Sequence, residues 1–133
     1  MAAANPALQG FVVQASATGL EFLLGVKNDA RLGAAVVLGF GGVLAEAMDA
    51  RAVALAPLDR GEAAAMIERV DRHRLLDGWR GSPPLAREAL VRAVLALGQL
   101  AWEQRERLAE LDLNPIVVTP TAALVVDIAV VLR

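Results

Sequence analysis

Two apolar runs near the carboxyl end of the sequence, residues 111–119 and 122–132, constrain the fold more than any other feature. Each run is rich in Val, Leu and Ile, and Pro120-Thr121 separates them. This pattern predicts two antiparallel strands joined by a two-residue loop. With that loop, Asn114 lies directly opposite Asp127. Directly opposed residues share a sheet face, with Cβ atoms about 4.5–5.5 Å apart. The hairpin therefore places an amide and a carboxylate side by side.

The other apolar patterns predict an α+β domain. Short runs with the composition of strands occur at residues 11–14, 21–26, 33–38 and 52–56. Two stretches with apolar residues every three to four positions follow, at residues 62–74 and 85–109. Because strands and helices do not alternate regularly, this order favours a largely antiparallel sheet with two main helices over a parallel fold. We expect residues 1–9 to be a loose leader and residues 10–133 to form one domain.

The composition excludes several classes of protein. The formal net charge is −2 with no basic block, which gives no electrostatic reason to expect nucleic-acid binding. The absence of cysteine excludes disulfides and thiolate metal sites. The apolar fraction is high, at 56%, yet the charge-free stretch Leu32–Ala45 is shorter than the roughly 18 residues that a spanning helix needs. Polar residues interrupt the other such stretch, Met1–Leu20. We expect a cytoplasmic protein without a membrane span.

The opposed Asn114 and Asp127 are candidate metal ligands. Mg²⁺ usually takes one or two protein oxygens together with water and substrate phosphates. An Asn-Pro pair at a strand start is most often a turn device. A carboxylate inside an apolar strand, however, costs several kcal/mol unless it is paired or binds a metal. Period two places Glu110 and Asp112 on the same face. Pro115 cannot donate a ladder hydrogen bond, which predicts an edge strand or a bulge.

Two glycine-containing segments are candidate phosphate-binding elements. Gly39-Phe40-Gly41-Gly42 allows the backbone to approach an anion closely, although a plain loop is the simpler interpretation of the cluster by itself. Arg80, between glycines in Gly78-Trp79-Arg80-Gly81, can reach a phosphate with two N–H groups. The alternative is a surface arginine in a turn between helices. His73 is the only histidine and lies among charged residues, so it receives no role.

Six segments, taken in order, resemble one protein family. They are Glu21–Asp29 with Leu32-Gly33, Gly39–Glu46, Ala56–Leu58, Leu75–Gly81, Glu110–Ile116 and Val126-Asp127. From about Gly10 onward their order and spacing are similar to the carboxy-terminal part of the ATP-grasp domain of NDP-forming acyl-CoA synthetases. The pattern is more distantly similar to the nucleotide-binding subunit of succinyl-CoA synthetase. Ala50 and Ala54 depart from the family, which usually has Asp and Arg at these positions.

This resemblance implies an activity and a set of site residues. The activity is the reversible conversion of acyl-CoA, NDP and phosphate to acid, CoA and NTP, through a phosphohistidine supplied elsewhere in the enzyme. Asn114 and Asp127 would hold Mg²⁺, and Glu46 would lie in the cleft that binds ATP or ADP. Gln14, Ala15 and Ser16 would form the hinge beside the adenine.

The resemblance also implies partners. An ATP-grasp site lies between two subdomains, so the amino-terminal subdomain, with its phosphate-holding lysine, and CoA-binding domains would complete the enzyme. We expect the 133-residue chain alone to bind MgATP weakly or not at all, to be inactive, and to self-associate through the uncovered wall. The alternative function is a non-catalytic interaction or sensor domain, such as the synthetase-like region of a protein lysine acetyltransferase.

Overall fold

The computed structural model describes residues 9–133, so the expected leader, residues 1–9, lies outside the described residues except for Gln9. The strands are β1 (Leu20–Asp29), β2 (Gly33–Phe40), β3 (Arg51–Leu55), β4 (Leu108–Val118), β5 (Ala123–Val125) and β6 (Ile128–Leu132). The helices are α1 (Gly42–Met48), α2 (Arg60–Val70), α3 (Arg87–Glu103) and the 3₁₀ turn η1 (Leu75–Asp77).

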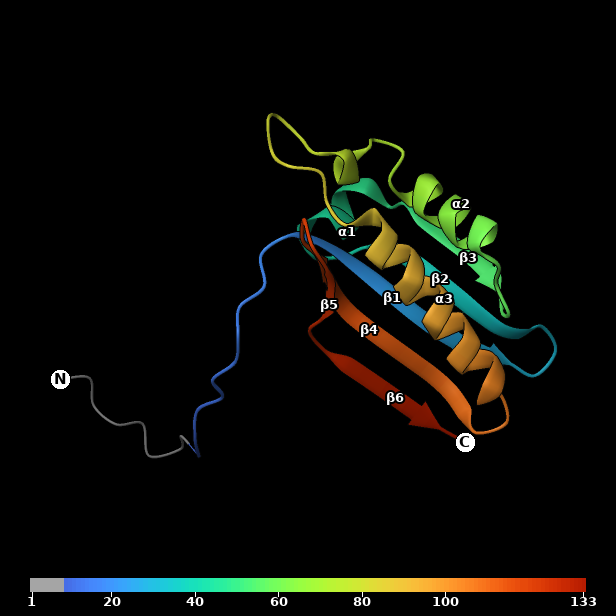
Figure 1. Cartoon of the computed structure of the whole chain (residues 1–133). Coiled ribbons are helices and arrows are strands. Elements are labelled where there is room, and N and C mark those ends of the chain that lie inside the picture. The colour runs from blue at the N-terminus through green and yellow to red at the C-terminus, as the bar shows by residue number, and fades with distance from the viewer. Residues whose placement is uncertain (1–8) are drawn as a thin grey trace.

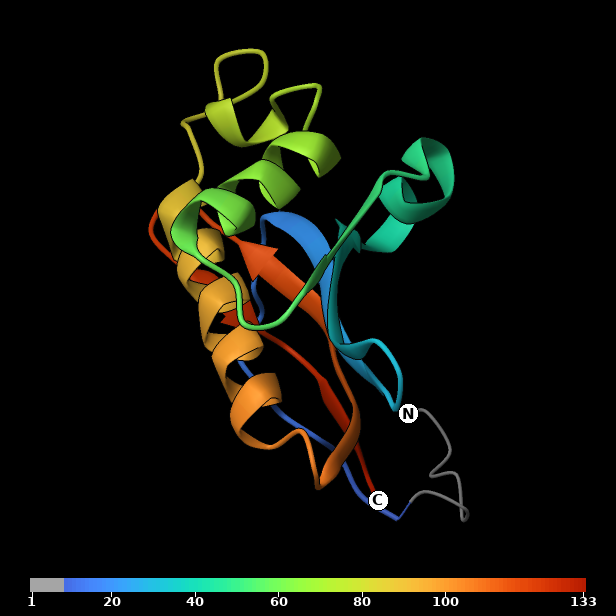
Figure 2. The same cartoon turned by 90° about the vertical axis from the view of Figure 1, so that its right-hand side faces the viewer.

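The strands form one antiparallel sheet in the order β3-β2-β1-β4-β5, and β6 also pairs with β4. Helices α2 and α3 lie side by side on one face of the sheet (Figure 1). Figure 2 shows this layer edge-on, with α2 and α3 on one side of the sheet and α1 projecting on the other. The α+β class and the two main helices are thus confirmed, and most of the opposite face of the sheet has no helical cover.

The core lies between the sheet and the two long helices. Along β1, Phe22, Leu24 and Val26 alternate with residues of the other face and are buried. The ring of Phe22 stacks on Phe40 of β2, with 5.1 Å between centroids. Helix α3 contributes the buried residues Leu90, Val91, Val94, Leu97 and Ala101. This one-sided burial follows from the two periodicities, two residues in the strands and about 3.6 in the helices.

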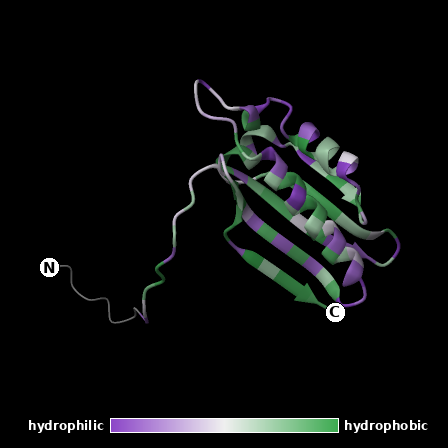
Figure 3. Cartoon of the chain, viewed as in Figure 1, coloured by the Kyte–Doolittle hydropathy of each residue, from purple (hydrophilic) through white to green (hydrophobic). Residues whose placement is uncertain are grey.

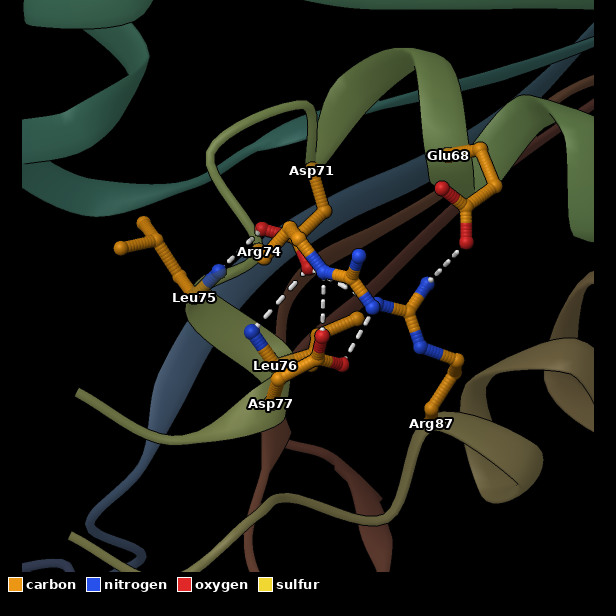
Figure 4. Close-up of polar contacts among 7 residues, drawn as sticks. All are labelled: Glu68, Asp71, Arg74, Leu75, Leu76, Asp77 and Arg87. Carbon is orange, nitrogen blue, oxygen red and sulfur yellow. Dashed lines mark hydrogen bonds and ion pairs between the residues drawn. The ribbon is translucent and has the colours of Figure 1, made fainter. Parts of the chain in front are cut away.

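A buried aspartate organises the connection between α2 and α3 (Figure 4). Asp71, only 1% exposed, accepts hydrogen bonds from the backbone N–H groups of Leu75 at 2.7 Å and Leu76 at 3.0 Å. The Arg87 guanidinium contacts Asp71 at 3.2 Å and Asp77 at 3.1 Å. Hydrogen bonds from Arg74, the larger cause, and from Arg87 lower the pKa of Asp77. Asp71 therefore ends α2, holds η1 and anchors the start of α3.

Four expectations about the elements need correction. Residues 11–14 do not form a strand, because the structure places no strand beside them in the described part of the chain. The segment after the glycine cluster, where the sequence pattern predicts no helix, is helix α1. The predicted strand 122–132 is divided at Val126-Asp127 into β5 and β6. The predicted helix 85–109 ends at Glu103, and β4 begins five residues later.

No helix within residues 9–133 has the length and apolar character needed to cross a membrane.

Candidate functional site

Asn114 and Asp127 lie directly opposite each other, as the hairpin pattern predicts. On one side of the pair Ile116 is opposite Val125, and on the other Leu113 is opposite Ile128, so one register runs through the pair and shifts only farther along, between Glu110 and Leu108. The backbone N–H of Asn114 donates to the carbonyl of Asp127 at 3.2 Å. Because opposed residues share a face, the amide and the carboxylate project together from the side of the sheet that α2 and α3 leave open.

The strand around Asn114 is bulged. The register between β1 and β4 shifts between Phe22 and Leu24, so that Asn114 and Pro115 together face the single residue Leu23. The bulge expected from Pro115 is confirmed, whereas the edge position is wrong, because β4 pairs with strands on both sides. A bulge re-aims the side chains beside it, and bulges are common next to binding sites.

The expected burial of Asp127 is wrong, because β6 and its flanking residues lie at the open margin of the sheet. Both Asn114 and Asp127 are exposed. One carboxylate oxygen, Oδ1 of Asp127, accepts a hydrogen bond from the Ile128 N–H at 2.8 Å, which orients the side chain. Within residues 9–133 no group of three or more His, Cys, Asp or Glu side chains could hold a metal by itself. The pair therefore fits a cation such as Mg²⁺ that takes its remaining ligands from phosphate and water.

The segment Gln14–Ala17 lies beside this pair. It lines a shallow pocket of about 280 Å³ together with Leu124, Val125 and Val126. Since Val126 directly precedes Asp127, the predicted hinge residues Gln14, Ala15 and Ser16 lie at the same margin of the sheet as the candidate metal ligands. Two groups of candidate residues that are far apart in the sequence are thus brought to one margin of the sheet.

The other two candidates, Glu46 and Arg80, lie at the end of the sheet where β1 begins. Glu46 is exposed on α1. Arg80 is in the loop between η1 and α3, with its guanidinium 5.8 Å from the ring centroid of Trp79. Leu44 and Trp79 line one pocket of about 370 Å³, which brings α1 and this loop together. Among the described residues, no hydrogen bond or ion pair joins Glu46 or Arg80 to Asn114 or Asp127.

Comparison with known proteins identifies the family. A family model described as an ATP-grasp domain matches residues 1–132. This chain belongs to the ATP-grasp family. Its relatives confirm the resemblance to acyl-CoA synthetases. It is 34% identical, over 126 residues, to "Acetate--CoA ligase [ADP-forming] I" of Archaeoglobus fulgidus. It is 33% identical, over 114 residues, to the beta subunit of the corresponding ligase of Pyrococcus furiosus.

Structural similarity supports the same assignment. Acetyl-coenzyme A synthetase 1 of Ca. Korarchaeum cryptofilum, solved with coenzyme A and Mg-AMPPCP, superposes with a TM-score of 0.81 at 36% identity. That match covers 89% of this chain and 55% of the other. The Archaeoglobus match covers 94% of this chain but 18% of that relative. The Pyrococcus match covers 86% of this chain and 49% of that subunit. This ATP-grasp chain thus spans only part of its relatives.

The open face of the ATP-grasp chain carries further charged groups. Lys27 on β1 forms an ion pair with Glu110 on β4 at 3.1 Å, and Gly25 lies opposite Asp112. Glu21 lies against Gly42, where an added Cβ would be 2.3 Å from a carboxylate oxygen of Glu21. Period two along β4 predicts Glu110 and Asp112 on this face, whereas Glu21 and Lys27 were not predicted. Counting every second residue along β1 from Glu21 would have found both.

Proposed function

We propose that this chain forms the magnesium- and nucleotide-binding wall of an NDP-forming acyl-CoA synthetase. The reaction would convert acyl-CoA, NDP and phosphate to acid, CoA and NTP through a phosphohistidine on another part of the enzyme. The observation that carries the proposal is the opposed pair of Asn114 and Asp127, exposed on the open face of an ATP-grasp sheet. The relatives are named as ADP-forming acid–CoA ligases, which supports this reaction class.

Each site residue has a distinct role in this proposal. Asn114 and Asp127 would hold Mg²⁺ through their side-chain oxygens, and the ion would neutralise phosphate charge during phosphoryl transfer. Gln14, Ala15 and Ser16 would contact the adenine, since they line the pocket beside β5. Arg80 and Glu46 would lie toward the phosphates, where the guanidinium can donate two hydrogen bonds to one phosphate group.

The isolated chain would bind nucleotide weakly and turn nothing over. A small-molecule pocket usually buries about 70–90% of its ligand. The pocket beside Gln14–Ala17 is shallow and open, and one wall can cover only one side of a purine. An amino-terminal ATP-grasp subdomain and CoA-binding domains would supply the other wall and the remaining chemistry.

A chimeric enzyme tests this function. The chain would replace its matching segment in the beta subunit of the Pyrococcus furiosus ligase, and ATP formation from acetyl-CoA, ADP and phosphate would be measured. We expect Asn114→Ala and Asp127→Ala to lower kcat/KM by about a hundredfold or more, because each removes an oxygen ligand. Glu103→Gln, which alters a carboxylate on the helix layer, is the matched control and should leave the rate unchanged. Full activity of Asp127→Ala would remove that residue from the site.

A further inference from the structure

Strand β6 leaves an apolar edge that the nucleotide proposal does not use. Within residues 9–133, β6 pairs with β4 alone. Its residues Ile128, Val130, Val131 and Leu132 are 51–61% exposed. Figure 3 shows β6 as hydrophobic along almost its whole length, whereas polar residues recur along β4. Natural proteins usually protect such an edge with charge, proline or a covering segment, and β6 contains neither a charged residue nor a proline.

The backbone of β6 directs three residues outward. The carbonyl of Asp127 accepts from Asn114 on β4, and the N–H of Arg133 donates to the carbonyl of Arg107 at 2.9 Å. Residues 127 and 133 therefore direct their backbone groups toward β4. Because these groups alternate along an antiparallel strand, Ile128, Val130 and Leu132 direct their N–H and C=O groups away from the sheet.

We propose that β6 pairs antiparallel with β6 of a second copy of this chain, with Val130 opposite Val130 of that copy. In this register Val130 pairs with Val130 of the second copy and Ile128 lies opposite Leu132. The Ile128 N–H exchanges its present acceptor, Oδ1 of Asp127, for the Leu132 carbonyl of the second copy. The charges flanking the strand also match, because Asp127 lies opposite Arg133 of the second copy. The two-fold symmetry produces this ion pair twice, once at each end of the apolar pairing. Neighbouring registers leave outward residues unpaired and misalign these charges.

The surroundings of β6 are compatible with this pairing. Val130 and Leu132 line an apolar pocket of about 290 Å³ with Leu100 of α3 and Leu111 of β4, and Ile128 of the second copy would lie next to its rim. The Arg133 guanidinium donates a hydrogen bond to the carbonyl of Asn28 on β1 at 3.2 Å, at an exposed position. It therefore leaves Asn28 when it pairs with Asp127 of the second copy.

The pairing closes on itself. A strand that pairs with its own copy gives an isologous dimer, whereas pairing of β6 with β3, the strand at the other margin, would continue into fibres. The two margins can be distinguished by substitution. The Ala56 N–H donates to the Ala34 carbonyl of β2, so residue 56 directs its backbone groups toward β2. Because these groups alternate along the strand, the Val53 N–H points outward from β3, as the Val130 N–H does from β6. Proline at either position removes only an outward donor.

Sedimentation equilibrium of the 133-residue chain over a wide concentration range tests the proposal. We expect wild type and Val53→Pro to dimerise reversibly and Val130→Pro to be monomeric, with circular dichroism confirming the fold. Asp127→Arg and Arg133→Asp should each weaken the dimer, and the double variant should restore it. Monomeric wild type at all concentrations would overturn the proposal. That result is expected if residues 11–14 of the same chain cover the edge of β6. A dimer lost in Val53→Pro, or not restored by the charge swap, would overturn it too.

Discussion

Asp71 and Asp127 show how differently one residue type can be used in this chain. Asp71 is buried, and its carboxylate accepts hydrogen bonds from two backbone N–H groups and from the Arg87 guanidinium. Asp127 is exposed and receives a single backbone N–H. These partners of the Asp71 carboxylate all lie in the connection between α2 and α3 or at the start of α3, so the role of Asp71 is structural. The carboxylate of Asp127 faces solvent beside Asn114, where it can bind a ligand.

We expect Asp71→Ala to lower the free energy of unfolding by about 3 kcal/mol, since it removes one partner of a buried ion pair and leaves two N–H groups without an acceptor. Urea denaturation measures this change. Asp77→Ala is the matched control, because Asp77 contacts the same Arg87 but is exposed, and it should cost much less. Equal losses in the two variants would contradict the structural role of Asp71.

The opposite result is expected for Asp127→Ala. Among the described residues, the hydrogen bond from the Ile128 N–H is the one side-chain hydrogen bond that it removes, at an exposed position. Its free energy of unfolding should stay within about 0.5 kcal/mol of wild type, as for most surface substitutions. A loss similar to that of Asp71→Ala in the same denaturation assay would show that Asp127 is structural.

At the scale of elements, the hairpin could be predicted from sequence because the loop length at Pro120-Thr121 fixes the register of both strands. The bulge at Asn114-Pro115 was expected in kind, but the division of the last strand at Val126-Asp127 was not, since its residues are uniformly strand-forming. Helix α1 has only seven residues, too few for periodicity to distinguish it from a loop. Residues 11–14 have strand composition, but a strand also needs a partner, which the chain does not provide in its described part.

The contact between α2 and α3 should depend on pH. Arg60 of α2 donates two hydrogen bonds to Glu88 of α3, one of them at 2.6 Å, and this contact lowers the pKa of Glu88. A carboxyl with a lowered folded pKa adds stability that is complete above its ordinary value, 4.5 for Glu88, and is lost as the pH falls through the lowered value. We therefore expect Tm to fall below about pH 4.5, and to fall less steeply in Glu88→Gln. Identical Tm profiles for the two proteins would contradict this role of the ion pair.

At the scale of the whole molecule, the sheet and its helix layer form one body to which the first described residues contribute little. Phe11, Val12 and Val13 are 83–94% exposed. We expect a variant that begins at Thr18 to keep its circular dichroism spectrum and a Tm close to that of the full chain, because none of the described residues that it lacks belongs to the core. A large fall in Tm would show that the removed segment stabilises the sheet.

The open face was the part of the molecule that sequence could only partly predict. The hairpin register brought Asn114 and Asp127 together, but their relation to Gln14–Ser16 depends on where the chain enters the sheet, which no local pattern contains. Glu46 and Arg80 were chosen from the glycines around them. The structure places both at one end of the sheet, and in the described part of the chain no hydrogen bond or ion pair connects them to Asn114 or Asp127.

The proposed role of Asn114 and Asp127 is to bind a metal–nucleotide complex. The most direct measurement is paramagnetic broadening of NMR signals in the isolated chain by Mn²⁺ with ATP, at concentrations high enough to detect weak binding. We expect the signals of Asn114, Asp127 and their strand neighbours to broaden first, only when ATP is present, and this effect to disappear in Asp127→Ala. Absence of broadening at these residues, or broadening that persists in Asp127→Ala, would contradict the assignment.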